Sequence, residues 1–471
     1  MFDLDMQTAE AMAAHDRFWT PTNLDWRGRV YGLPSFNFQR DDHVRALFLF
    51  ADGEPIGEEG VYWLKVHLAN CGDDDREGFI KVGKLTFDER VRWVDENLEK
   101  IKTVATAPLS ELWWTKADKP FQFLAACFEL SSALALGPTF VSRLPICFDG
   151  SCSGLQHLSA MTRDEETAKL VNLTPSAVPR DIYETVADIV RRRIKNDLAY
   201  PDEESHLAQM WLNYGIGRKI VKRSAMTYFY GSSEWGMAEQ LREDLMRPFA
   251  DDVKNAKRKE HPFGEDEGDS AAKYIARYIH LTIEREVERP AAAMLVLQNL
   301  AAAMSHEDLW PRWTTPAGFP WANCYYKQKA KQVRLYLHSL GVSFRVLLTT
   351  GEGPHPEIDK RKAKNGVAPN FVHACDAAHL MRTVNAAVAE GITSIATVHD
   401  SFGCLPSRAE RFRKIIREEF VRMYEEHDVL AEVFAQARAD LSRNTKRMPS
   451  APPQYGTLDL KKVLDAEFAF A

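Results

Sequence analysis

The sequence predicts an α+β fold in which helices dominate and a few antiparallel strands form a small sheet. Two observations support this fold class. Short apolar runs end in tight polar turns, as strands do. Over most of the 471 residues, however, apolar side chains recur at helical spacing. The expected helices cover residues 8–19, 86–104, 176–198, 204–230, 270–304, 376–390 and 407–443. This mixture favours a helical lobe inserted into a sheet-containing domain.

Three strand segments define the expected sheet. The apolar run 144–148 leads directly into Asp149-Gly150. The run 393–398 ends at His399-Asp400, and 402–405 resumes the strand pattern, which predicts a hairpin with its turn at 399–401. The segment 334–350 contains a central glycine and predicts a second, longer hairpin. Within the helical region, Pro290 is expected to kink or break the 270–304 segment.

Composition places the chain among large globular proteins that work inside a cell. Its length predicts two to four domains or subdomains. It contains neither a signal peptide nor an apolar run of the roughly 18 residues that a membrane span needs. The net charge of −7 argues weakly against nucleic-acid binding, but basic residues cluster at 218–223, 327–334 and 360–364. Taken alone, each cluster is more readily explained as a solvated surface.

Two aspartates stand at the ends of apolar strands. Asp149 lies in Phe-Asp-Gly-Ser, and Asp400 lies in Val-His-Asp-Ser. Carboxylates at neighbouring strand ends can hold two Mg²⁺ ions, and two such ions can activate an attacking hydroxyl and stabilise a leaving phosphate oxygen. Taken singly, each aspartate is more readily explained as a turn residue that bonds to its own backbone. The interpretation as a metal pair therefore depends on a further motif.

That motif is a cationic helix between the two aspartates. Arg218, Lys222, Met226 and Tyr230 recur at every fourth residue, so one helix face presents two cations, a flexible apolar side chain and an aromatic ring. The cations can neutralise a triphosphate, and the tyrosine can stack on an incoming base. Gly231 is suited to end the helix. In isolation, the stripe could also be an ordinary surface helix.

The order of these motifs resembles motifs A, B and C of the single-subunit, bacteriophage-type and mitochondrial-type DNA-dependent RNA polymerases. Asp-Gly-Ser at 149–151, Arg-x₃-Lys-x₇-Tyr-Gly at 218–231 and His-Asp-Ser at 399–401 carry the resemblance. Segments 25–31, 55–65 and 368–373 and the terminal Phe-Ala-Phe-Ala also look like family segments, in the family's order. The resemblance covers nearly the whole chain and implies the catalytic palm and fingers of a right-hand polymerase.

The resemblance also implies roles for individual residues. Asp149 and Asp400, with the Gly150 carbonyl, resemble the ligands of two Mg²⁺ ions, and Lys222 joins the two aspartates in the catalytic set. The nucleotide contacts implied are Arg218, Lys222, Tyr230, His373, Lys84 and Gly154. The template and product contacts implied are Arg29, Tyr31, Gly231 and Arg345. The carboxy-terminal Phe470-Ala471 resembles a tail that folds back towards the active site.

The expected organisation follows the same family. Residues 1–165 correspond to the first part of the palm. Residues 166–372 correspond to the fingers, with a promoter-reading hairpin around 325–350, and residues 373–471 complete the palm. The thumb and N-terminal domain of the family are expected to be absent. The implied partners are a DNA template and promoter, NTPs, the RNA product and possibly a separate N-terminal polymerase fragment. The expected location is intracellular, and it is the host cytoplasm if a phage encodes the chain.

Three alternatives remain open. A related A-family DNA polymerase would normally carry glutamate five residues after the motif A aspartate and His-Asp-Glu in motif C. Here these positions hold Gly154 and His-Asp-Ser, which favours ribonucleotides. A catalytically silent fragment that binds nucleic acid would be expected to have lost a carboxylate or Lys222, whereas all of them are present. A hydrolase is the least favoured alternative, because the sequence around Ser153 resembles the G-x-S-x-G motif but has the wrong spacing.

Overall fold

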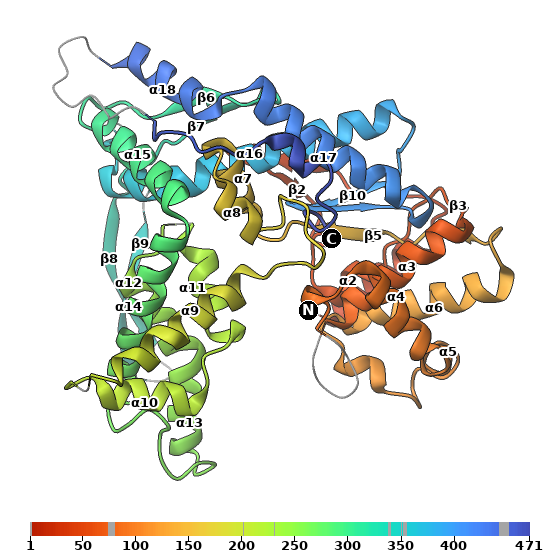
Figure 1. Ribbon diagram of the computed structural model, residues 1–471, viewed down its shortest axis with the longest axis horizontal. Coiled ribbons are helices and arrows are strands. Elements are labelled where there is room, and N and C mark those ends of the chain that lie inside the picture. Colours follow the sequence, from red (N-terminus) through yellow and green to blue (C-terminus); the bar gives the residue numbers. More distant parts are fainter. Residues whose placement is uncertain are drawn as a thin grey trace.

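The computed structural model describes residues 2–73, 81–200, 202–229, 231–337, 341–349, 351, 356–441 and 452–471. Helices make up more than half of the fold, and the strands form small antiparallel sheets. The predicted α+β class is therefore confirmed. In Figure 1, helices α9–α14 form one lobe and α2–α6 form another; strands β5 and β10 and helices α7, α16 and α17 lie where the two lobes meet.

The N-terminal part is organised around one buried helix, α3. It contains helices α1 (Phe2–Ala13), α2 (Asp42–Arg45), α3 (Gly57–Gly72), α4 (Phe87–Glu96), α5 (Leu98–Thr106) and α6 (Pro120–Leu136), the 3-10 helices η1 (Val82–Lys84) and η2 (Trp113–Lys116), and the strand pairs β1 (Thr22–Leu24) with β2 (Val30–Gly32) and β3 (Glu54–Pro55) with β4 (Val141–Ser142). Helix α3 packs against both α4 and α6. The predicted helix 86–104 begins at a Thr86–Glu89 capping box but divides at Asn97 into two helices. The predicted helix 8–19 was misplaced, since α1 ends at Ala13.

A three-stranded antiparallel sheet joins the first and last parts of the chain. Its strands are β5 (Ile146–Asp149), β10 (Ile395–Val398) and β11 (Ser401–Cys404), in the order β10-β11-β5. The predicted hairpin is confirmed, with His399 and Asp400 in the turn between β10 and β11. His399 adopts a left-handed backbone with φ of 57°. Such tight turns need a positive φ, and this one places the next residue at the tip of the hairpin.

The segment between β5 and β6 is almost wholly helical. It contains α7 (Ser153–Thr162), α8 (Glu165–Leu170), α9 (Ile182–Asp197), α10 (Ser205–Tyr214), α11 (Arg218–Tyr228), α12 (Glu234–Leu241), the π-helical turn η3 (Arg242–Met246), α13 (Arg247–Lys254), α14 (Asp269–Glu286) and α15 (Glu288–Ser305). The predicted helix 204–230 is interrupted between Tyr214 and Arg218, where Gly215 has a φ of 95°. The predicted helix 270–304 breaks at Val287 and not at Pro290. Proline fits the first turn of α15 because an N–H there has no intrahelical partner.

The C-terminal part returns to the sheet. It contains β6 (Arg312–Thr314) paired with β7 (Pro320–Ala322), the hairpin β8 (Ala330–Leu337) and β9 (Val342–Thr349), α16 (Lys360–Ala389), η5 (Pro406–Arg408), α17 (Ala409–Glu426), α18 (Val429–Asp440) and η6 (Leu460–Val463). The predicted hairpin around 334–350 is confirmed. Helix α16 starts well before the predicted residue 376 and continues through Pro369. Its long buried face packs on α7, α15 and α17, which outweighs the cost of the proline.

Within the described residues, no helix combines the length and apolar character needed to cross a membrane.

Candidate active site

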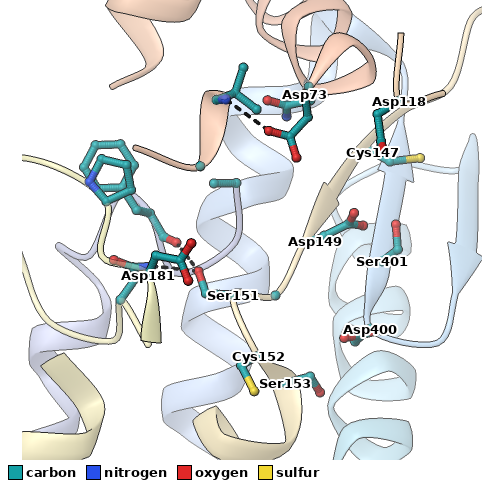
Figure 2. A pocket seen from close by; sticks show the side chains of 18 of the residues that line it. Asp73, Asp118, Cys147, Asp149, Ser151, Cys152, Ser153, Asp181, Asp400 and Ser401 are labelled. Atoms are coloured by element: carbon teal, nitrogen blue, oxygen red, sulfur yellow. Dashed lines mark hydrogen bonds between the residues drawn. The ribbon is translucent and has the colours of Figure 1, made fainter. Parts of the chain in front are cut away.

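The ends of β5 and of the β10–β11 hairpin bring the two predicted aspartates together. Ser401 pairs directly with Asp149 across β11 and β5, so Asp400 is one residue from the pairing partner of Asp149. Figure 2 shows Asp149 and Ser401 on adjacent strands and Asp400 at the turn that precedes Ser401. Burial raises the pKa of Asp400, and the negative charge of Asp149 raises it further. We call this pair of side chains the carboxylate corner.

The carboxylate corner opens into a cavity of about 530 Å³. This cavity lies between the sheet, the C-terminal end of α3, the N-terminal end of α6 and one face of α11. Its charged lining residues are Arg45, Asp73, Arg90, Asp118, Lys119, Asp149, Arg180, Asp181, Arg218, Lys222 and Asp400. A cavity with carboxylates at one end and several cations around them suits an anionic ligand that arrives with a metal ion.

The predicted stripe on α11 faces this cavity. Arg218, Lys222 and Met226 all line it, as the four-residue spacing requires. Burial lowers the pKa of Lys222, and the neighbouring Arg218 charge lowers it further. No carboxylate among the described residues forms an ion pair with Lys222 within 4.0 Å. The ammonium is therefore available to an anion in the cavity.

Arg218 is held in position by a helix cap that the sequence analysis did not identify as part of the site. Asp181 caps α9 through one carboxylate oxygen, which accepts hydrogen bonds from the backbone N–H groups of Tyr183 and Glu184. The other oxygen accepts a 2.6 Å hydrogen bond from Arg218 Nε. The Arg218 guanidinium also lies 5.3 Å from the centre of the Tyr183 ring. One carboxylate thus fixes both the start of α9 and the direction of Arg218.

Two of the three predicted glycines line the cavity, and the third follows α11. Gly150 and Gly154 line it, the latter in the buried first turn of α7. Gly231 follows α11 with a φ of 83°, and the Gly231 and Ser232 N–H groups bond to carbonyls of the last helical turn. A Cβ at Gly231 would lie 3.1 Å from the Asn365 carbonyl oxygen. In a regular α-helix the N–H of residue 369 would donate to the Asn365 carbonyl, but Pro369 has no N–H. The missing hydrogen bond in α16 and the missing side chain at Gly231 together allow α11 and α16 to approach each other.

Two predicted nucleotide contacts fall outside the described residues: Tyr230, and the side chain of Lys84, whose backbone closes η1.

Arg29, Tyr31 and His373 form a second group, outside the cavity lining but next to the motif C turn. Arg29 binds both carboxylate oxygens of the buried Asp376 on α16. The ring centre of Tyr31 is 4.9 Å from that of His399. The Nδ1 atom of His373 is 2.9 Å from an Arg27 guanidinium nitrogen. Burial lowers the pKa of His373 to about 2, with further contributions from Arg29 and Arg27.

Arg345 lies apart from both groups, on the β8–β9 hairpin. It stands directly opposite Arg334 in the antiparallel register, and its side chain is exposed. The hairpin side chains Tyr336, Phe344 and Leu347 are also exposed, by 58%, 43% and 68%. This surface is basic and aromatic, as a nucleic-acid contact would be.

The chain's last residues reach the carboxylate corner, in line with the expectation for the tail. The Ala471 N–H donates a 3.1 Å hydrogen bond to the Asp149 carbonyl, and Gly150 forms an isolated bridge with Phe470. Arg413 on α17 holds the tail by donating to the Glu467 carbonyl at 2.5 Å. The Arg413 guanidinium also lies 4.2 Å from the centre of the Trp63 ring. The sequence spacing did not predict these contacts between Arg413, the tail and Trp63.

Lys119 is a further residue that the sequence analysis missed. Its Nζ is 4.0 Å from Asp149 Oδ2, at the end of the cavity. Burial opposes a charge on Lys119, but the Asp149 carboxylate raises the pKa, which stands above its ordinary value. No local motif marks this lysine, because it precedes α6 while its partner lies on β5, 30 residues further along the chain.

The residues present fit divalent metal binding. Hard divalent cations prefer oxygen ligands, and the carboxylate corner offers two carboxylates, one of which, Asp149, is 53% exposed. A cation between the two would remove the repulsion that raises the Asp400 pKa. Within the described residues, no group of three or more His, Cys, Asp or Glu side chains forms a closed metal site. An open site with few protein ligands is the arrangement that Mg²⁺ uses with phosphate substrates.

Comparison with known proteins confirms the predicted resemblance. A family model described as DNA-dependent RNA polymerase matches residues 54–452. T7 RNA polymerase of Escherichia phage T7 is 39% identical to this chain, over 99% of the chain and 55% of its own length. The DNA-directed RNA polymerase of Enterobacteria phage T3 is 38% identical, with 99% and 54% covered. The mitochondrial DNA-directed RNA polymerase 1 of Nicotiana sylvestris is 33% identical, with 99% and 44% covered.

The chain thus spans about half the length of the phage relatives it matches. Because the family model covers most of the chain and the motif residues converge on one cavity, the chain belongs to the family of phage-type and mitochondrial-type DNA-dependent RNA polymerases.

Proposed function

We propose that this chain carries out DNA-templated RNA synthesis, transferring nucleotides from NTPs to the 3′ end of RNA. The observation that carries the proposal is the convergence of Asp149, Asp400, Arg218 and Lys222 on one cavity. A cavity that combines these two carboxylates with several cations matches the needs of a metal-bound triphosphate. The relatives compared above are RNA polymerases, which supports the same activity.

Each side chain has a distinct part in this proposal. Asp149 and Asp400, with the Gly150 carbonyl, would hold two Mg²⁺ ions. When bound, such ions polarise the attacking hydroxyl and stabilise the leaving phosphate oxygen. Arg218, oriented by Asp181, and Lys222 bind the triphosphate. Tyr230 and the Lys84 side chain, both outside the described residues, are proposed as further nucleotide contacts.

Selection of ribonucleotides is proposed to depend on space near the sugar. Gly154 lines the cavity in the first turn of α7 and has no side chain to oppose a 2′-hydroxyl. His373 is held neutral by burial and by two arginines, so it can exchange hydrogen bonds with a hydroxyl without carrying charge. A DNA polymerase would be expected to fill the position of Gly154 with a bulky side chain.

We further propose that residues 1–165 and 373–471 form a palm and 166–372 form fingers. Arg29, Tyr31 and Gly231 would lie along the template and product. Arg345 on the β8–β9 hairpin would contact promoter DNA, where arginine reads guanine through paired hydrogen bonds. A separate N-terminal polymerase fragment is proposed as a further partner in promoter-dependent initiation.

Primer extension tests the proposed activity. The purified chain should extend an RNA primer on a DNA template when NTPs and Mg²⁺ are present, and it should use dNTPs far less efficiently. Asp400→Ala should abolish extension, while Asp52→Ala, which changes an exposed aspartate distant from the cavity, should not. Preference for dNTPs would favour a DNA polymerase. Equal inertness of wild type and Asp400→Ala, with a longer relative active in the same assay, would favour a silent nucleic-acid-binding fragment.

A further inference from the structure

Lys119 places a positive charge at the carboxylate corner before any metal ion arrives. Its Nζ is 4.0 Å from Asp149 Oδ2, and both side chains line the same cavity. We propose that Lys119 is a built-in counter-ion of Asp149, which stabilises the metal-free protein and competes with divalent cations for the carboxylate corner. This inference rests on the proposed function, because it assumes that Asp149 and Asp400 bind metal.

The backbone that carries Lys119 is held from two sides. The Lys119 N–H donates a 2.9 Å hydrogen bond to the Cys71 carbonyl, and the Asp118 N–H donates to the Gly72 carbonyl at 3.3 Å. Across α6, the Asp42 carboxylate caps the helix by accepting from the Phe121 and Gln122 N–H groups at 2.7 and 3.1 Å. The lysine can therefore leave Asp149 only by rotating its own side chain, not by a shift of the helix.

Of the titratable groups near the Lys119 ammonium, Asp149 is the one that carries the opposite charge. Among the described residues, Asp149 is the carboxylate within ion-pair distance of Lys119. Arg45 carries a like charge on the same side. His67, on α3, is buried and neutral, because burial lowers its pKa to about 3. The nearby Cys71 and Cys147 thiols are also neutral, since burial raises their pKa to about 12 and about 11.

Competition follows from charge. A divalent cation on Asp149 must approach a side chain that an ammonium already neutralises in part, and the two cations repel. Both side chains are partly exposed, by 37% for Lys119 and 53% for Asp149, so solvent weakens the effect. Replacing Lys119 by glutamine should therefore tighten metal binding by about three- to tenfold rather than by many orders of magnitude.

Direct metal binding is the first test. Mn²⁺ serves as the probe, and its free concentration is followed by electron paramagnetic resonance with no nucleotide or nucleic acid present. Lys119→Gln should bind Mn²⁺ about three- to tenfold more tightly than wild type. Lys102→Gln removes the same charge from an exposed pair on α5 and should leave the affinity unchanged. Asp400→Asn should lose the tight site.

The outcomes separate the inference from the proposed function. If Asp400→Asn loses Mn²⁺ binding but Lys119→Gln matches wild type or binds more weakly, the counter-ion role is wrong and the metal site stands. If wild type binds no more Mn²⁺ than Asp400→Asn, the metal site itself is refuted, and the role of Lys119 falls with it. A rise in KM for NTPs in Lys119→Gln, at unchanged Mn²⁺ affinity, would instead make Lys119 a phosphate contact.

Thermal unfolding gives a second readout that a purely structural lysine would not reproduce. With EDTA, Lys119→Gln should unfold at a lower temperature than wild type, because Asp149 and Asp400 lose their counter-charge. With saturating Mg²⁺, the difference should close or reverse, because bound metal replaces the lost charge. An equal deficit under both conditions would show that Lys119 acts through packing alone and would overturn the proposal.

Discussion

Asp376 is a buried carboxylate and Asp400 a half-buried one, and their surroundings differ in kind. Asp376 on α16 is matched by Arg29, which binds both of its oxygens, and the two side chains are only 4% and 13% exposed. Burial raises the pKa of both carboxyls, that of Asp376 to about 6 despite Arg29, but Asp400 faces a second carboxylate, Asp149, whose negative charge raises its pKa further. No cationic side chain of the described residues forms an ion pair with Asp400.

The difference distinguishes a structural carboxylate from a functional one. A buried charge with its own cation contributes to a defined geometry, and removing one partner leaves the other uncompensated. A carboxylate set against another carboxylate costs stability in the free protein, so its position makes sense only if a ligand cation supplies the missing charge. Lys119, 4.0 Å from Asp149, compensates only part of that charge.

Conservative substitutions at the two positions should therefore have opposite effects. Asp400→Asn should lower primer-extension activity on the order of a thousandfold, because metal-dependent stabilisation of the transition state is lost. In EDTA it should leave the free energy of unfolding unchanged or raise it. Asp376→Asn should lower that free energy by about 3–5 kcal/mol, because Arg29 loses the buried carboxylate with which it forms an ion pair. Urea unfolding and primer extension measure the two quantities.

If Asp400→Asn destabilises the protein as much as Asp376→Asn does, Asp400 is also a structural group. The distinction between a structural and a functional carboxylate would then be wrong.

A pH series sharpens the description of the group around Arg29. The pKa of His373 is lowered to about 2 in the folded chain, against an ordinary value of 6.5. The unfolded chain therefore takes up a proton as pH falls through 6.5, while the folded chain does not, so stability is present above 6.5 and lost below it. Between pH 6.5 and 5, His373 should cost wild type about 2 kcal/mol of unfolding free energy.

The measurement compares urea unfolding of wild type and His373→Gln across this range, because other buried histidines contribute equally to both. The stability advantage of wild type over His373→Gln should shrink as pH falls. An advantage that is constant with pH would mean that His373 is solvated and free to ionise.

The parts of the site that the sequence predicted correctly are those that depend on a local motif. Asp149 and Asp400 follow strand-turn patterns, and both strands and the hairpin formed as predicted. The Arg218–Lys222 stripe is likewise a property of one helix. Helix boundaries were less well predicted, because α16 runs through Pro369 once its buried face is covered by three other helices.

The partners of the site residues could not be predicted, because each contact joins elements distant in the chain. Asp181 carries an N-cap pattern, which a sequence can show, but its bond to Arg218 depends on how α9 packs on α11. Lys119 reaches Asp149 only because α6 is tied to the end of α3. No sequence pattern indicated a role for Asp376, because its ion-pair partner, Arg29, lies near the start of the chain.

Arg413 is a cation that the protein satisfies with carbonyls and aromatic rings. It donates to the tail at Glu467 and lies over Trp63. Arg413→Met keeps the apolar contacts but loses the hydrogen bonds, so we expect a loss of about 1–2 kcal/mol in unfolding free energy. Because the tail bonds to the Asp149 carbonyl, kcat should fall severalfold with little change in KM. Arg411→Met, which removes an exposed pair on the same helix, is the control.

Release of the tail can be followed independently by digestion with carboxypeptidase. Faster loss of Ala471 in Arg413→Met than in Arg411→Met is expected. Equal digestion rates would show that α17 does not hold the tail through Arg413.

Arg345 presents the opposite case, a cation with which no described carboxylate forms an ion pair. It stands across from Arg334 on the β8–β9 hairpin, and like charges directly opposite one another destabilise a strand pair. Arg345→Ala should therefore leave the free energy of unfolding unchanged or raise it by a few tenths of a kcal/mol. The same change should weaken binding to duplex DNA by about tenfold and reduce the salt dependence of that binding by about one unit of slope. Extension of a short primed template should be unaffected, because the hairpin residue lies outside the cavity lining. A loss of stability without a loss of DNA affinity would mean that Arg345 serves the hairpin rather than a nucleic acid, and the contrast between satisfied and unsatisfied charges would then hold only at the carboxylate corner.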